Sequence, residues 1–215
     1  MAKSFMKPIR RTTHFIIYGL LLLVLNSCYA LMGLKKNVDW NQETITKAAK
    51  EYNIPSEYSY VLDTLYFDYL KSYKINNKNA VKNHLQPLQA LYHDKNGNLS
   101  VFLINCYTSG FPNLNWNKNN VLETFPPQQQ APLDSILTIE KHLTFLEPLN
   151  DTTIPTDQIN AQSGEIILVY WSLMMGRQSK RFIKAIQKNK TLSSHSNTVI
   201  LYVNSDLVLS SYAAK

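Results

Sequence analysis

Two largely apolar runs decide the fold: EIILVYW at residues 165–171 and TVILYV at residues 198–203. Runs of this kind are typical of strands that are buried on both faces of a sheet. Between them, residues 180–190 place Phe182 and Ile186 on the apolar side of a basic amphipathic helix. A strand, a helix and a second strand in this order predict a β-α-β unit with two adjacent parallel strands.

The segment before this unit predicts a β-hairpin and a helix. Residues 87–92 and 99–104 are largely apolar, and an Asn-Gly pair at residues 96–97 lies between them. Such a pair between two apolar runs favours a tight hairpin turn. A loop over residues 107–130 follows, and we expect its aromatic residues to pin it to the body. Residues 132–147 then have the apolar spacing of an amphipathic helix.

Helices are expected throughout residues 41–86. Asn41 can cap a helix that runs to about residue 52. Residues 56–75 are rich in tyrosine and have helical apolar spacing, and residues 77–86 are a candidate for a short polar helix. We interpret this segment as an N-terminal helical extension. The α/β domain then spans residues 87–215, with a four-stranded mixed sheet and helices on both faces.

The strand-to-turn segment at residues 169–182 resembles the active-site turn of the thioredoxin family. That family places an aromatic residue and a tryptophan before Cys-Gly-Pro-Cys-Lys, which opens a helix, and Tyr170, Trp171 and Gly176 fit this pattern. Residues 204–206 after the second strand also correspond to the family. The resemblance covers about forty residues of the chain and implies a thioredoxin-like sheet.

The two redox positions of that family are not cysteines in this chain. Met175 and Gln178 stand in their place, and Arg177 replaces the usual proline. A thioether and an amide cannot cycle between thiol and disulfide, so the resemblance implies a redox-inactive domain with no catalytic residue. We expect no cofactor.

The order of the elements also departs from the thioredoxin family. In this chain the hairpin and the helix precede the β-α-β unit, whereas the family has the β-α-β unit first. Circular permutation relates the two orders, and folding tolerates it because domain termini often lie close together. We therefore expect an α/β fold with a circularly permuted, thioredoxin-like mixed sheet flanked by helices. A plain β-α-β unit without that ancestry is the alternative.

The beginning of the chain has the pattern of a secretory signal peptide. Residues 1–14 carry four basic residues and no acidic one, and residues 15–25 form an uncharged run. These eleven residues are too few to span the hydrocarbon core of a bilayer, which needs roughly 20. An uncleaved membrane anchor is the alternative.

The sequence Leu-Asn-Ser-Cys at residues 25–28 resembles the lipobox of bacterial lipoproteins. In that family the cysteine is lipidated on sulfur and becomes the first residue after cleavage. The resemblance implies a signal peptide over residues 1–27, a lipidated Cys28 and a tether over residues 28–40. Tyr29 is not the aspartate that retains some lipoproteins at the inner membrane, which favours the periplasmic side of the outer membrane.

Removal of the signal peptide changes the charge balance of the chain. The full chain has 22 basic and 15 acidic residues, and four of the basic residues lie within residues 1–27. The remaining excess of positive charge is small, so we expect no nucleic-acid partner. The basic residues within 177–190 are interpreted as a solvated helix face. Contact with anionic lipid headgroups or with an acidic partner is the alternative.

Metal and thiol chemistry find little support in the sequence. The histidines after residue 28 are His84, His93, His142 and His195, and no two of them have metal-ligand spacing. We expect these histidines on the surface and no metal. Cys106 ends an apolar run, so we expect it to be buried and inert.

These patterns predict a membrane-anchored envelope lipoprotein whose non-catalytic domain binds a protein or peptide. The turn after residue 171 is the candidate binding site, because it lies at the carboxyl end of a central strand and leads into a helix. Its candidate residues are Met174, Met175, Gly176, Arg177 and Gln178. The alternative for both methionines is that they fill the core. The alternative functions are a thioredoxin-derived envelope enzyme and a structural envelope component without a specific ligand.

Overall fold

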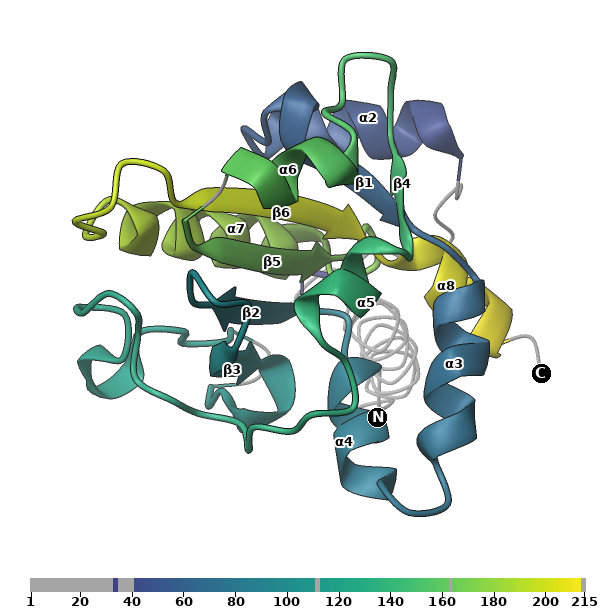
Figure 1. The fold of residues 1–215 in the computed structure, drawn as a ribbon, viewed down its shortest axis with the longest axis horizontal. Coiled ribbons are helices and arrows are strands. Elements are labelled where there is room, and N and C mark those ends of the chain that lie inside the picture. Colours follow the sequence, from purple (N-terminus) through teal and green to yellow (C-terminus); the bar gives the residue numbers. More distant parts are fainter. Residues whose placement is uncertain (1–32, 35–40, 111–112, 163, 214–215) are drawn as a thin grey trace, which may run out of the picture.

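The computed structural model describes residues 33–34, 41–110, 113–162 and 164–213, which form one mixed sheet flanked by helices (Figure 1). The predicted signal peptide over residues 1–27 and Cys28 lie outside the described residues. The strands are β1 (Ser59–Leu62), β2 (Gln89–His93), β3 (Leu99–Ile104), β4 (Leu146–Pro148), β5 (Ile166–Trp171) and β6 (Val199–Asn204). The helices are α2 (Gln42–Glu51), α3 (Leu65–Tyr73), α4 (Lys78–His84), α5 (Ile139–Leu143), α6 (Thr156–Gln162), α7 (Gly176–Lys190) and α8 (Asp206–Ala213).

The six strands follow the order β3-β2-β5-β6-β1-β4. β6 pairs in parallel with β5 on one side and with β1 on the other, whereas β2 and β4 pair antiparallel with β5 and β1. Leu168 of β5 stands opposite Leu201 of β6 and Leu91 of β2. The predicted β-α-β unit is therefore confirmed, and so is the hairpin that extends its sheet.

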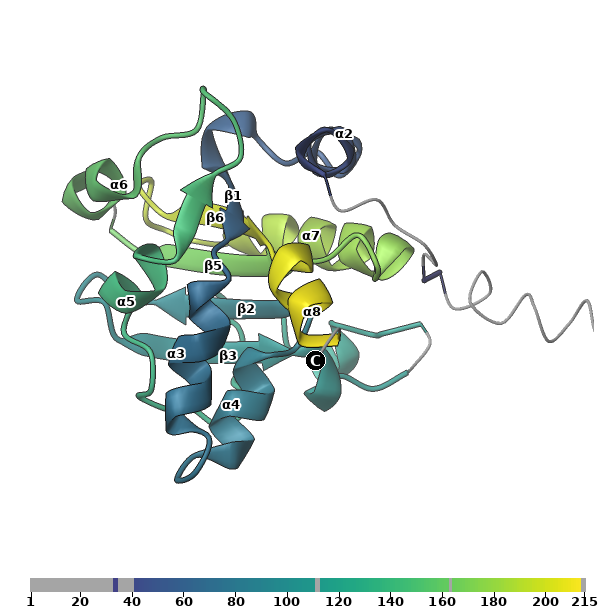
Figure 2. The same ribbon diagram turned by 90° about the vertical axis from the view of Figure 1, so that its right-hand side faces the viewer.

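Both faces of the central strand β5 are buried, which is why its sequence contains no charged residue. Alternate side chains of a strand point to opposite faces. Ile167, Val169 and Trp171 belong to the core on one face, which includes residues of α2 and α7. The intervening residues belong to the core on the other face, under α3, α4, α5 and α8 (Figures 1 and 2). The helices thus form two layers with the sheet between them.

The helix expected over residues 56–75 is wrong in its first part. Ser59–Leu62 is strand β1, and helix α3 begins only at Leu65. The chain here follows tertiary pairing rather than local spacing, because β1 finds backbone partners in both β6 and β4. The expected four-stranded sheet therefore has six strands.

The helix expected over residues 132–147 is also largely wrong. Only Ile139–Leu143 is helical, and the Thr138 side chain caps it by accepting a hydrogen bond from the Lys141 N–H at 3.3 Å. Leu146 begins strand β4, while Leu133 is 48% exposed. The apolar residues within 132–147 belong instead to a loop, a short helix and an edge strand, each of which makes its own contacts.

The expected anchoring of the long loop after β3 is confirmed. The rings of Trp116 and Phe182 of α7 lie 4.0 Å apart between centroids, and the ring of Phe125 meets Tyr92 of β2 at 5.9 Å. The side-chain amide of Asn189 donates to the carbonyl oxygens of Leu122 and Thr124 at 2.9 and 2.7 Å. This loop is therefore fastened to the α7 side of the sheet.

Candidate functional site

A buried carboxylate holds the turn that follows β5. Asp206, the first residue of α8, accepts hydrogen bonds from the Ser172 hydroxyl and from the Leu173 N–H, the latter at 2.7 Å. The side-chain amide of Asn204, at the end of β6, donates to the same carboxylate at 2.7 Å. The carboxyl ends of the two central parallel strands are thus tied together through one side chain.

The first turn of α7 is fixed from two further directions. The Ser179 hydroxyl donates to the Ser172 carbonyl at 2.6 Å, and the Tyr52 hydroxyl donates to the Gly176 carbonyl at 3.2 Å. Tyr52 follows α2, so the neighbouring helix also positions this turn. The backbone from residue 172 to residue 179 therefore offers a rigid platform.

Asp206 stabilises the turn and is not placed to transfer protons at the surface. Burial raises the pKa of its carboxyl group above the ordinary value, although the hydrogen bonds from Ser172, Leu173 and Asn204 act in the opposite direction. Its side chain is fully buried, and those donors occupy both carboxylate oxygens. No oxygen is left facing solvent to meet a substrate.

The structure divides the five predicted site residues into two groups. Met174 is 38% exposed and Arg177 is exposed, so both present side chains to solvent. Met175, Gly176 and Gln178 are buried, at 7% exposure for Met175 and 1% for Gln178. Met175 belongs to the same core as Trp171. The alternative that the methionines fill the core is therefore correct for Met175 and wrong for Met174.

Arg177 lies between two other segments of the chain. Its N–H donates to the carbonyl of Gly33 at 3.1 Å, and its guanidinium donates to the Asn113 side-chain oxygen at 3.3 Å. Arg181, one helical turn later, reaches the same Asn113 oxygen at 3.4 Å. The N-terminal segment and the long loop therefore flank the beginning of α7.

Exposed apolar side chains gather at the carboxyl ends of the three parallel strands. Met174 follows β5, Leu207 follows β6 and Leu65 follows β1. Their exposed fractions are 38%, 37% and 61%. The strands are neighbours in the sheet, so these side chains lie along one edge, and open α/β sheets tend to bind ligands at that edge.

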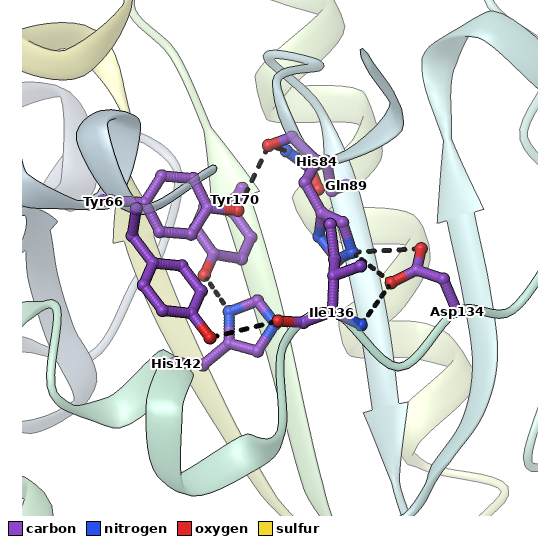
Figure 3. Close-up of polar contacts among 8 residues, drawn as sticks. Tyr66, His84, Gln89, Asp134, Ile136, His142 and Tyr170 are labelled. Atoms are coloured by element: carbon purple, nitrogen blue, oxygen red, sulfur yellow. Dashed lines mark hydrogen bonds and ion pairs between the residues drawn. The ribbon is translucent and has the colours of Figure 1, made fainter. Parts of the chain in front are cut away.

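A second cluster, on the opposite face of the sheet from α7, contains three buried histidines, and Figure 3 shows two of them, His84 and His142. His84 of α4, His93 of β2 and His142 of α5 are 1%, 2% and 0% exposed. The His142 ring lies 5.7 Å from the His84 ring and 6.0 Å from the His93 ring, measured between centroids. The expectation of surface histidines is therefore wrong for these three and correct for His195.

Two of the three imidazoles have one polar partner each. Nε2 of His84 lies 3.0 Å from a carboxylate oxygen of Asp134, and Nδ1 of His142 lies 2.8 Å from the Tyr170 hydroxyl (Figure 3). The other ring nitrogen of each has no hydrogen-bond partner among the described residues, and neither nitrogen of His93 has one. A buried polar atom without a hydrogen-bond partner destabilises a fold, and it does so more strongly when the group is charged.

Burial keeps the imidazoles of His93 and His142 neutral. It lowers the pKa of His93 to about 4, although the negative charges of Glu140 and Asp94 act in the opposite direction. It also lowers the pKa of His142 well below the ordinary value, and the neighbouring His84 and His93 add to this effect. His93 and His142 therefore resist protonation near neutral pH.

His93 is the member of the cluster that borders a surface pocket. The pocket has a volume of about 330 Å³, and its lining includes Asp94, Gly97 and Glu140. Within the described residues, no three His, Cys, Asp or Glu side chains stand together as metal ligands would. The pocket thus borders the His93 side chain, and the described residues around it do not form a metal centre.

Sequence reasoning missed the histidine cluster because its members come from three separate elements. A usable signal was present in the local patterns. His84 follows Val81 at helical spacing, His142 follows Ile139 in the same way, and His93 extends an apolar strand. Each histidine therefore occupies a position where an apolar residue would be buried.

The expectation of a buried Cys106 is wrong. This cysteine lies just beyond β3 in a short 3₁₀ turn, Asn105–Tyr107, and is exposed. Its thiol donates to the side-chain oxygen of Gln86 at 2.8 Å. Among the described residues it is the sole cysteine, so no second thiol of that part of the chain can pair with it.

Comparisons of the chain with models of known protein families, with curated proteins and with solved structures give no match. None of the helices in the described part of the chain combines the length and the hydrophobicity that a membrane span requires.

Proposed function

We propose that the chain is a bacterial envelope lipoprotein, anchored through Cys28, whose globular part is a redox-inactive, circularly permuted thioredoxin-like domain that binds a protein or peptide. The anchoring is supported by the basic segment, the short apolar run and the Leu-Asn-Ser-Cys sequence at residues 25–28. Several acyl chains on one residue hold a protein stably, whereas one chain binds only weakly.

The pairing of the strands supports the permuted thioredoxin-like fold. The hairpin β2–β3 lies antiparallel beside β5, and β6 lies parallel on the other side of β5. In a thioredoxin-like sheet the hairpin pairs with the β-α-β unit in this way, although here the hairpin comes first in the chain. Strands β1 and β4 extend the sheet beyond β6.

The residues at the former redox positions support a binding role rather than catalysis. Met175 and Gln178 are buried and carry no thiol. The exposed Cys106 belongs to the end of β3 and not to the turn after β5. A domain with this turn retains the rigid platform of the family without its dithiol chemistry.

The single observation that carries the binding function is the row of exposed apolar side chains at the carboxyl edge. Met174 and Leu207 stand there on a turn and a helix start that the Asp206 hydrogen bonds hold in place, and Leu65 stands at the start of α3. Met174 adapts to varied apolar surfaces because its unbranched side chain has several rotatable bonds. Arg177 adds a forked donor for a carboxylate or a peptide carbonyl.

Capture of partners by the lipidated full chain from its own envelope tests this function. The variant Met174→Asp/Leu207→Asp should reduce capture about tenfold, because charge is introduced at two of the three members of the apolar row. A matched control, Leu133→Asp/Leu192→Asp, adds the same charge at two leucines with exposed fractions of 48% and 47% elsewhere on the surface. Equal capture by both variants, with unchanged melting temperatures, would refute the binding edge.

A further inference from the structure

The exposed face of α7 is entirely basic. Its solvent-facing side chains all carry positive charge, and no residue from Gly176 to Lys190 is acidic. The opposite side of the helix packs Phe182, Ile183 and Ile186 into the core. The exposed basic residues are Arg177, Lys180, Arg181, Lys184 and Lys188.

Helix α2 lies beside α7 and belongs to the same outer layer (Figure 2). Ile45 of α2 and Ile183 of α7 share one core, and the Gln187 side chain donates to the carbonyl of Asn53 at 2.9 Å. The exposed surface of α2 adds Lys47 and Lys50 beside Glu43 and Glu51. The two helices together present a broad surface with an excess of positive charge.

The N-terminal segment of the chain meets this layer at the start of α7. The Arg177 N–H donates to the Gly33 carbonyl at 3.1 Å. A Cβ atom at Gly33 would lie 3.0 Å from the Arg177 Cβ, and the φ angle of Gly33 is +70°, so the close approach requires glycine. Gly33, in the described N-terminal segment, therefore contacts the layer formed by α2 and α7, which we call the basic layer.

The distance along the chain from this contact to Cys28 is short. Cys28 precedes Gly33 by five residues, which can span at most about 17 Å. Helix α7, with 15 residues, is about 22 Å long. A lipid on Cys28 thus enters the bilayer within less than one helix length of the basic layer.

We propose that the outer surface of α2 and α7 lies against the anionic headgroups of the membrane that holds Cys28. This orientation rests on the lipidation proposed above. Basic residues near an anionic bilayer are attracted to it within a Debye length, and Lys180, Lys184 and Lys188 form one stripe along the helix. The carboxyl edge with Met174 and Leu207 then remains at the side of the domain, open to a partner.

The attachment point selects this face over the other basic surface of the domain. Exposed lysines also lie just after α3, at Lys74, and on α4, at Lys82. Helices α3 and α4 cover the opposite face of the sheet from α7 (Figure 2), the helix that Gly33 contacts. A tether that leaves beside Arg177 brings the α7 face to the bilayer first.

Lysine acylation followed by mass spectrometry tests the orientation on the lipidated full chain. The probe surfaces are vesicles of phosphatidylcholine with phosphatidylglycerol, and vesicles of phosphatidylcholine alone, compared with the chain in detergent. On the anionic vesicles, acylation of Lys180, Lys184 and Lys188 should slow about fivefold or more, since each basic residue near the surface contributes about that factor. Lys74, Lys82 and Lys95 should react as they do in detergent.

Charge reversal supplies the matched variants. Lys184→Glu/Lys188→Glu should remove most of the protection at Lys180, whereas Lys78→Glu/Lys82→Glu should leave it intact; all four positions are exposed, so folding is preserved. A chain without lipid on Cys28 by intact mass would overturn both the anchoring and this orientation. A lipidated chain whose α7 lysines react equally fast on anionic vesicles and in detergent would overturn the orientation alone.

Discussion

The imidazole of His93 couples the stability of the fold to pH. Its pKa is about 4 in the folded chain, against an ordinary value of 6.5. As the pH falls below 6.5, the unfolded chain binds a proton that the folded chain does not, so the free energy of unfolding decreases until the pH reaches about 4. Between pH 7.5 and 4.5 we expect a loss of more than about 2 kcal/mol, with a further loss from His142.

Urea unfolding across this pH range measures the effect. The variant His93→Leu should recover about 2 kcal/mol of the loss, because leucine neither titrates nor leaves buried nitrogens without partners. His195→Leu, at an exposed position, should leave the pH dependence unchanged. Asp94 and Asp134, whose pKa values are lowered from 3.8, lose their contribution below this range. A His93→Leu protein as acid-sensitive as the wild type would contradict the account.

The Asp206 carboxylate stabilises the turn after β5 through its hydrogen bonds. Asp206→Ala leaves the Ser172 hydroxyl, the Leu173 N–H and the Asn204 amide without their acceptor in a buried place. We expect the free energy of unfolding to fall by about 2 kcal/mol at neutral pH. Asp151→Ala, at an exposed turn, is the control. Equal stability of the two variants would show that the turn holds without Asp206.

At the level of single elements, the apolar pattern predicted those strands and turns whose conformation the local sequence determines. The runs at residues 165–171 and 198–203 became β5 and β6, and the Asn-Gly pair at residues 96–97 became the turn of a hairpin. The sequence did not predict strand β1, because its four residues lie within a segment whose apolar residues also have helical spacing. Pairing with β6 and β4, distant in the chain, decides its conformation.

The turn of the hairpin β2–β3 depends on Gly97. Its φ angle is +79°, and a Cβ atom there would lie 2.8 Å from a methyl carbon of Ile139. Gly97→Ala should therefore lower the free energy of unfolding by about 1 to 3 kcal/mol, through backbone strain and crowding. Lys95→Ala, in the same turn and exposed, should change it by less than about 0.5 kcal/mol. Thermal unfolding of both variants compares the two positions.

For the whole molecule, the sequence predicted the class of fold but only part of the candidate site. The β-α-β unit placed the turn after Trp171 at the carboxyl edge, and Met174 and Arg177 are exposed there. The apolar row needed Leu65 and Leu207, which come from distant segments and share an edge only through the strand order. The histidine cluster likewise forms only through the fold, although the apolar spacing around each histidine indicated that it is buried.

The central claim concerns the attachment of the whole molecule to a membrane through Cys28, and fatty-acid labelling in bacterial cells tests it most directly. The wild-type chain should incorporate the label, because the apolar run ends at Leu-Asn-Ser-Cys. Cys106→Ser should incorporate as much label as the wild type, since Cys106 lies at the end of β3. Cys28→Ser should incorporate none, and label that survives in Cys28→Ser would contradict the account.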